Sequence, residues 1–388
     1  MNSGKNRVPG SQRILHRMEK KTLGILGGGQ LGRMSALAAS RLGIRVVVFT
    51  DQKGAPATQV CDHSIIADYN NKQALEDFAG KVDCITYEFE NIPVETIRFL
   101  QSRKPVLPDD RVLEISQHRS REKQFLNDIG IPTTRWAEVK SAKDIEKKLG
   151  EWNVEKCIIK TARFGYDGKG QALIQPDNDI KGIIRGFKAR EFIIEEVVEF
   201  SYEISVIAAR DKLGQIITYP AVLNQHRNHI LSKTVAPAPV QKELDHKARQ
   251  MAELLADSVD LVGVLALEFF VTPEGHLLAN EIAPRPHNSG HWTIEACGVS
   301  QFEQHVRAVC AWPVADPARH SDAVMINLIG EDATKLAYFL ETPGISLHLY
   351  GKDTIREGRK MGHITLLGPL GNGVNIDKNK ALKHYLPQ

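Results

Sequence analysis

The chain has 388 residues, of which 42% are hydrophobic and 25% are charged, and its formal net charge is +3. This composition is typical of a globular protein with several packed units, and the small net charge gives no reason to expect nucleic acid as a partner. No apolar run reaches membrane-spanning length, and residues 1–20 lack the hydrophobic segment of a signal peptide, so we expect a disordered tail and no membrane partner. The five scattered cysteines predict reduced, mostly buried thiols in a cytoplasmic protein.

Strands and helices alternate in the first part of the chain, a pattern typical of a parallel α/β sheet. The strands are expected at residues 22–26, 44–49, 64–67 and 83–87, and the helices up to about Leu42 and near residues 71–79 and 93–102. Residues 21–117 are therefore predicted to form a Rossmann-like domain.

A glycine motif follows the first of these strands. Gly27, Gly29 and Gly32 match the pattern G-x-G-x-x-G, and Asp51 lies at the end of the next strand. The motif favours a nicotinamide or flavin dinucleotide. Alternatively, the N-terminus of the following helix binds another phosphate, or none.

Two glutamates follow the strand at residues 83–87. Ligands of open parallel sheets bind at the carboxyl ends of the strands, so we expect a ligand role for Glu88. For Glu90 we expect a structural role, as a cap for the helix that begins at Pro93.

A second glycine-rich stretch, I-I-K-T-A-R-F-G-Y-D-G-K-G-Q, follows a β-branched run that ends at Lys160. Its glycines let the backbone N–H groups approach a polyphosphate, and Lys160 supplies a positive charge at the strand end. The plainer interpretation is a hairpin with a solvated tip.

A candidate adenine slot lies between the next two predicted strands. The strands at residues 192–195 and 201–206 flank Glu195 to Val198, and Glu203 could accept hydrogen bonds from the ribose hydroxyls. The alternative for Glu195 and Glu203 is a solvated strand face.

A pair of carboxylates is expected to meet on neighbouring strands. The apolar run at residues 263–271 carries Glu268, and the strand at residues 276–282 carries Glu281. Hairpin pairing across the turn at residues 273–275 would bring the two together, where they repel unless a cation lies between them or they share a proton. Magnesium bound to nucleotide phosphates is the natural occupant.

Further helices are expected over residues 119–130, 177–187, 241–259 and 301–311, and a polar stretch with His226 separates strands at residues 216–219 and 230–235. Residues 284–292 are dense in hydrogen-bonding groups and predict a ligand-contacting loop. In the smaller C-terminal piece, three of the residues from Arg356 to Lys360 are basic, which indicates either a phosphate clamp or a solvated turn.

These motifs together resemble the ATP-grasp superfamily and, within it, the 5-(carboxyamino)imidazole ribonucleotide synthase family. The specific matches are G-G-G-Q-L-G-R-M, T-Y-E-F-E-N-I-P, G-Y-D-G-K-G-Q, N-E-I-A-P-R-P-H-N-S-G-H-W and G-R-K-M-G-H. The resemblance runs from about Lys21 to Leu386. It implies an α/β fold with the Rossmann-like domain, an ATP-grasp unit at residues 118–315 with lobes at 118–198 and 199–315, and a small, mostly β C-terminal domain at residues 316–388.

The resemblance also implies the reaction. ATP and magnesium activate bicarbonate as carboxyphosphate, and the amine of 5-aminoimidazole ribonucleotide is carboxylated, leaving ADP and phosphate. A homodimer is expected from the family. Tyr166, Asp167, Lys169 and Lys360 are expected to serve catalysis, with Asp167 as the candidate for receiving the amine proton.

The remaining implied contacts fall into three groups. ATP is expected against Arg119, Lys160, Gly165, Tyr166, Asp167, Gly168, Lys169, Gly170, Gln171, Glu195, Glu196, Val197, Val198, Glu203, His226, Asn280 and Glu281. The ribonucleotide is expected against Gln30, Leu31, Glu88, Arg285, His287, Asn288, Arg359 and Lys360. Magnesium is expected on Glu268 and Glu281.

Two positions depart from the family pattern: Phe164 stands where many relatives have glycine, and Ala283 where many ATP-grasp enzymes have an asparagine metal ligand. Three other functions remain as alternatives. They are a dinucleotide-dependent oxidoreductase, a nucleotide-binding module without turnover, and a related ATP-grasp ligase with another acceptor.

Overall fold

The computed structural model describes residues 20–163, 165, 170–187 and 189–374. The predicted tail before Lys20 lies outside the described residues, as do Phe164 and the loop residues Tyr166, Asp167, Gly168 and Lys169. None of the described helices is long and apolar enough to cross a membrane. All five cysteines are free, as predicted, and four of them are buried.

The N-terminal region forms the predicted parallel sheet, with strand order β3-β2-β1-β4. Its strands are β1 (Thr22–Leu26), β2 (Arg45–Thr50), β3 (His63–Ile66) and β4 (Cys84–Tyr87). Its helices are α1 (Gln30–Arg41), η1 (Pro56–Gln59), α2 (Lys72–Gly80), α3 (Val94–Gln101) and α4 (Asp110–Ser116). Helix α4 was not predicted, although its N-cap is an ordinary one in which the Asp109 carboxylate accepts from the Val112 N–H.

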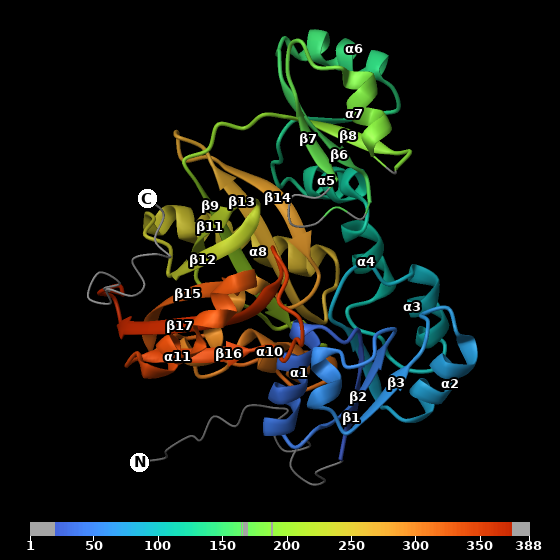
Figure 1. Cartoon of the computed structure of the whole chain (residues 1–388), viewed down its shortest axis with the longest axis vertical. Helices are drawn as coiled ribbons and strands as arrows, with labels where there is room; N and C mark the ends of the chain where they lie inside the picture. The colour runs from blue at the N-terminus through green and yellow to red at the C-terminus, as the bar shows by residue number, and fades with distance from the viewer. Residues whose placement is uncertain (1–19, 164, 166–169, 188, 375–388) are drawn as a thin grey trace, which may run out of the picture.

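A second sheet is antiparallel and has the order β5-β8-β6-β7. Its strands are β5 (Trp136–Val139), β6 (Cys157–Thr161), β7 (Gln171–Ile174) and β8 (Phe192–Glu196). Helices α6 (Ala142–Trp152) and α7 (Ile180–Gly186) pack against it, and α5 (Arg119–Asp128) precedes it. In Figure 1 this small sheet lies at the top of the molecule, apart from the N-terminal sheet at the lower right.

The largest sheet has the order β14-β13-β9-β11-β12-β15-β17-β16, and β10 pairs with β9. Its strands are β9 (Tyr202–Arg210), β10 (Ile216–Thr218), β11 (Val222–Arg227), β12 (Ile230–Ala236), β13 (Gly263–Val271), β14 (Leu277–Ala283), β15 (Ser321–Ile329), β16 (Ile345–Leu349) and β17 (Lys360–Pro369). The associated helices are α8 (Lys242–Ser258), η2 (Asn288–Gly290), α9 (Thr293–Ala296), α10 (Gln301–Val309), η3 (Gly330–Lys335) and α11 (Leu336–Glu341). The C-terminal strands therefore continue the same sheet rather than forming one of their own.

The polar stretch around His226 is a strand, β11, which corrects the prediction of a non-strand segment there. Asn224 on β11 is buried and hydrogen-bonded to Ser205 on β9 and Thr234 on β12. A buried polar side chain that is satisfied across the sheet breaks the apolar alternation by which strands are recognised.

Helix α10 fixes the N-terminal sheet against the large sheet. Phe302 and Val306 of α10 share one apolar core with Leu31 and Met34 of α1, while Ala308 belongs to the core beneath β9 and β13. The glycine loop before α1 is thereby held beside the carboxyl-terminal half of the chain (Figure 1).

Candidate active site

A cavity of about 630 Å³ opens where the three sheets meet. Most of the described residues predicted from the sequence line it: Gln30, Leu31, Glu88, Arg119, Lys160, Gln171, Glu195, Glu196, Val197, Val198, Glu203, His226, Glu268, Asn280, Glu281, Arg285, His287, Asn288 and Lys360. Three described residues from the predicted set, Gly165, Gly170 and Arg359, do not line it. The Arg359 guanidinium instead donates to the Thr354 carbonyl.

A cluster of cations lies on the small-sheet side of the cavity. The Lys160 ammonium is 2.8 Å from one oxygen of Glu195, and the Lys123 ammonium is 3.3 Å from the other. Burial alone would raise the pKa of Glu195, but the two lysines lower it to about 2. Burial and the neighbouring cations nevertheless lower the pKa of Lys160. The cluster thus carries more positive charge than Glu195 balances, as a phosphate site requires.

Lys123 does not line the cavity, but it is the second cationic partner of Glu195, which the sequence did not reveal. It is fully buried on α5, and its ammonium also donates to the Asn280 carbonyl of β14. Arg119, one turn earlier on the same helix, lies 3.7 Å from Glu281 and donates to the Gly165 carbonyl. The spacing of Arg119 and Lys123, four residues apart on one helix face, was the available signal.

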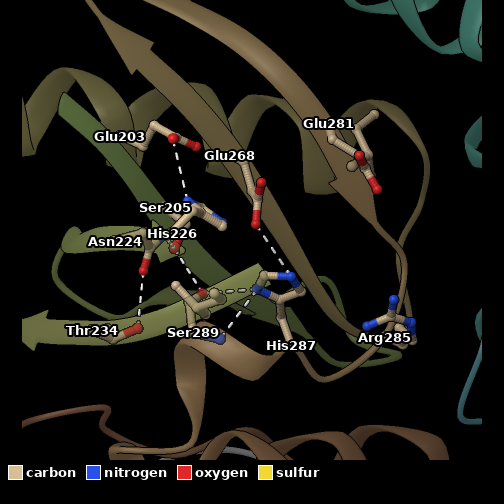
Figure 2. Close-up of polar contacts among 12 residues, drawn as sticks. Glu203, Ser205, Asn224, His226, Thr234, Glu268, Glu281, Arg285, His287 and Ser289 are labelled. Atoms are coloured by element: carbon tan, nitrogen blue, oxygen red, sulfur yellow. Dashed lines mark hydrogen bonds and ion pairs between the residues drawn. The ribbon is translucent and has the colours of Figure 1, made fainter. Parts of the chain in front are cut away.

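The predicted carboxylate pair is present in the lining of the same cavity. Glu268 of β13 and Glu281 of β14 are direct partners in the antiparallel register, and Figure 2 shows them on adjacent strands. Burial, followed by the charge of Glu281, raises the pKa of Glu268 to about 7. Behind them, burial and the same charge raise the pKa of Glu122 to about 8. This concentration of acids favours a bound cation.

His287 is held against Glu268 by a buried hydrogen-bond chain (Figure 2). Its Nδ1 accepts from the Ser289 N–H, so its Nε2 carries the proton and faces the Glu268 carboxylate at 3.2 Å. The Ser289 hydroxyl accepts from Ser205, which in turn accepts from the Asn224 amide. Burial and the charge of Arg285 keep the pKa of His287 well below its ordinary range, so the ring is neutral.

Another part of the cavity lining suits a nucleobase and its ribose. Phe200 and Phe270 stack with ring centroids 4.7 Å apart, and both line the cavity. Glu203 contacts His226 at 3.2 Å. Burial alone would lower the pKa of His226, but this carboxylate raises it. The Glu195 carboxylate, in contrast, forms ion pairs with Lys160 and Lys123 and is not available to a nucleobase.

In the glycine motif of the N-terminal domain, backbone N–H groups already donate to a side chain of the same protein. Glu88 accepts hydrogen bonds from the Gly29 N–H at 2.6 Å and the Gly32 N–H at 3.1 Å. These groups at the start of α1 are the ones that would otherwise bind a dinucleotide phosphate. Asp51 is exposed and does not line the cavity. The geometry therefore disfavours the dinucleotide alternative.

Glu90 does not cap α3, which corrects the role predicted for it. The N-cap residue of α3 is Pro93, and no side chain caps the helix. Both Glu90 oxygens instead accept from the Arg285 guanidinium, at 2.5 and 3.0 Å. This bidentate pair joins the N-terminal domain to the loop after β14 and fixes Arg285 in the cavity wall.

Family models match three consecutive parts of the chain. A ribonucleotide synthetase preATP-grasp domain matches residues 20–117, an ATP-grasp domain matches residues 124–302, and a phosphoribosylaminoimidazole carboxylase C-terminal domain matches residues 323–374. An N5-carboxyaminoimidazole ribonucleotide synthase of Brucella melitensis is 46% identical over 350 residues, which cover 90% of this chain and 96% of that protein. The Bacillus subtilis protein of the same name is 40% identical, covering 89% of this chain and 91% of its own.

Solved structures agree with these matches. The N5-carboxyaminoimidazole synthetase of Staphylococcus aureus complexed with ADP has a TM-score of 0.88 and 36% identity, covering 94% of this chain and 97% of the other. The Aspergillus clavatus synthase in complex with ADP and 5-aminoimidazole ribonucleotide has a TM-score of 0.86 and 28% identity, with the same coverage. The predicted fold class and family are confirmed. This chain belongs to the N5-carboxyaminoimidazole ribonucleotide synthase family of the ATP-grasp superfamily.

Proposed function

We propose that this protein is an ATP-dependent carbon–nitrogen ligase of purine biosynthesis. It carboxylates the amine of 5-aminoimidazole ribonucleotide with bicarbonate, giving 5-carboxyaminoimidazole ribonucleotide, ADP and phosphate. The observation that carries this proposal is that cations and a pair of acids line one cavity that also reaches the N-terminal glycine motif.

ATP lies with its phosphates toward Lys160 and Arg119, both of which line the cavity, and its base between the small and large sheets. The surplus of positive charge around Glu195 supports this direction. The stacked Phe200 and Phe270 supply an apolar wall, and Glu203 lies within reach of ribose hydroxyls.

The carboxylates that line the cavity fit Mg²⁺. Glu268 and Glu281 are adjacent carboxylates, and the buried Asn280 amide oxygen beside them has no hydrogen-bond partner among the described residues. Hard oxygen donors of this kind suit magnesium. When bound with the nucleotide, magnesium supplies charge neutralisation at the phosphates during transfer.

The ribonucleotide lies at the junction with the N-terminal domain. Arg285 and Lys360 supply positive charge for its phosphate, while the backbone at Gln30 and Leu31 begins α1 beside them. Asn288 lines the cavity, and both polar atoms of its buried side-chain amide lack a hydrogen-bond partner within the described residues, as expected of a group that binds a ligand.

The chemistry needs two steps in a closed site. A bicarbonate oxygen attacks the γ-phosphorus to give carboxyphosphate and ADP, and the amine then attacks the carboxyl carbon and releases phosphate. Carboxyphosphate hydrolyses readily, so the site must exclude water. Asp167, in the loop with Tyr166 and Lys169, is our candidate for accepting the amine proton; near-normal carboxylation by Asp167→Asn would assign this role elsewhere.

An isotope experiment tests this order of bond formation. With ¹⁸O-labelled bicarbonate, the oxygen that attacks phosphorus leaves with the phosphate, so one labelled oxygen should enter each phosphate released. Mass spectrometry of the phosphate measures it, with unlabelled bicarbonate in ¹⁸O water as the control. Label from water rather than from bicarbonate would mean simple ATP hydrolysis and would contradict the proposal.

We further propose that the protein works in the cytoplasm as a homodimer. Its five free cysteines suit a reducing compartment. The dimer follows from the family resemblance, and analytical ultracentrifugation measures it directly.

A further inference from the structure

Three side chains outside the cavity meet on the large sheet. His348 of β16 and His363 of β17 are direct partners in the antiparallel register, with their rings stacked 4.5 Å apart at 8°. Glu295 of α9 lies over them, with one carboxylate oxygen 2.6 Å from the His348 Nε2. One potential ligand atom from each of the three side chains falls within 4.8 Å of the others.

Two polar atoms of this group are buried without a hydrogen-bond partner in the part of the chain that the structure describes. They are the second oxygen of Glu295 and the Nε2 of His363. His363 is fully buried, and a buried polar group without a partner requires an explanation. The contact between His348 and Glu295 therefore satisfies only part of the cluster.

The other ring nitrogen of His363 is already occupied. Its Nδ1 lies 2.8 Å from the hydroxyl of Tyr350, which is itself buried. If Nδ1–H donates to this oxygen, the Nε2 lone pair is left free and aimed toward the cluster. Metal-binding histidines are held in this way, because the second nitrogen fixes the tautomer and orientation of the ring.

We propose that Glu295, His348 and His363 bind a divalent transition-metal ion, with Zn²⁺ as the best match. Two imidazole nitrogens and one carboxylate make a three-ligand set that leaves a fourth position for water. Imidazole ligands suit zinc and related ions but not magnesium, so this site differs in chemistry from the Glu268–Glu281 pair. The His348 side chain is 27% exposed, which gives an ion access from solvent.

A metal ion here would connect the elements that carry residues proposed to bind the ribonucleotide. Glu295 follows closely on the loop that holds His287 and Asn288, and His363 lies three residues after Lys360 on β17. The ion would fix α9 to β16 and β17 and so keep this loop and Lys360 at a fixed position relative to each other. Its role is structural, and it stands apart from the proposed carboxylation.

Metal binding by the tag-free, chelator-treated full chain tests the proposal. Titration with CoCl₂, followed by visible absorption, and competition with ZnCl₂ should give one site per chain with nitrogen and oxygen ligands. Both His348→Ala and Glu295→Gln should weaken binding at least about tenfold, and Tyr350→Phe by about 10- to 100-fold. Zn²⁺ should raise the melting temperature of the wild type but not of His348→Ala.

Two control variants test whether Co²⁺ binds at this cluster and not at another histidine or at the Glu268–Glu281 pair. His320→Ala alters an exposed histidine immediately before β15 of the same sheet and should bind Co²⁺ like the wild type. Glu268→Gln should also bind it normally. Retained nucleotide binding shows that His348→Ala is folded. No saturable binding, unchanged binding in His348→Ala, loss in Glu268→Gln, or a sulfur-ligated Co²⁺ spectrum would each overturn the proposal.

Discussion

Glu195 lies between two lysines, and its ionisation stabilises the small sheet. Glu195→Gln leaves Lys160 and Lys123 without their carboxylate partner, which we expect to cost about 3–5 kcal/mol of unfolding free energy. The folded-state pKa is about 2, against an ordinary value of 4.5. The difference in unfolding free energy between the wild type and Glu195→Gln is therefore complete above about pH 5 and disappears as the pH falls toward 2.

Urea denaturation of the two proteins at several pH values measures this difference. Glu146→Gln serves as the matched control, because Glu146 is an exposed glutamate on α6, away from the two lysines. A difference between wild type and Glu195→Gln that did not change between pH 6 and pH 3 would contradict the charge assignment.

The carboxylate pair provides a second prediction at the level of single residues. Glu268→Gln and Glu281→Gln each remove a proposed magnesium ligand and should lower kcat/KM for ATP on the order of 10²–10³-fold. Glu274→Gln is the matched control, because this exposed glutamate lies at the turn of the same hairpin. Steady-state ADP release measures all three variants. Near-normal activity in Glu268→Gln would remove the pair from the reaction.

At the scale of elements, the β6–β7 hairpin depends on Gly170. Its φ is +74°, and an added Cβ would lie 2.6 Å from the Thr161 hydroxyl oxygen. Gly170→Ala should therefore destabilise the small sheet by about 1–2 kcal/mol and weaken ATP binding.

Gly186→Ala is the control for this change, since Gly186 ends α7 and a Cβ there meets no atom of the described residues within 4 Å. Thermal unfolding and ATP titration measure both variants. Equal stability of Gly170→Ala and the wild type would show that the hairpin tolerates a side chain at this position.

The start of helix α1 provides another prediction about an element. Glu88 already accepts from the Gly29 and Gly32 N–H groups, so no anionic dinucleotide should bind there. NADH fluorescence should stay unchanged on titration with the protein, while ATP with magnesium should bind. Saturable NADH binding would restore the oxidoreductase alternative.

The parts of the fold and site that could be predicted are those encoded by local pattern. The pairing of Glu268 with Glu281 follows from two apolar runs joined by a short turn, and the structure shows the two as register partners. For Lys123 the local pattern offers only its four-residue spacing from Arg119 on α5. Its contact with Glu195 could not be predicted, because only the fold brings the two together. The pair between Glu90 and Arg285 likewise depends on contact between domains.

At the scale of the whole molecule, the active site exists only where three sheets meet. Helix α5 and the small sheet contribute the cations Arg119 and Lys160, the large sheet contributes the acids, and the N-terminal domain contributes the start of α1 at Gln30 and Leu31. Each sheet buries its own core, so the predicted elements account for the architecture. Their mutual placement depends on contacts such as those of α10, which no local pattern encodes.

The most direct measurement of the whole account is ADP release with each substrate omitted in turn. In bicarbonate-depleted buffer, release should require ATP, magnesium, bicarbonate and 5-aminoimidazole ribonucleotide together, and omission of any one should bring it to background. ADP release that is equally fast without the ribonucleotide and without bicarbonate would contradict the account, because the cavity would then serve another reaction.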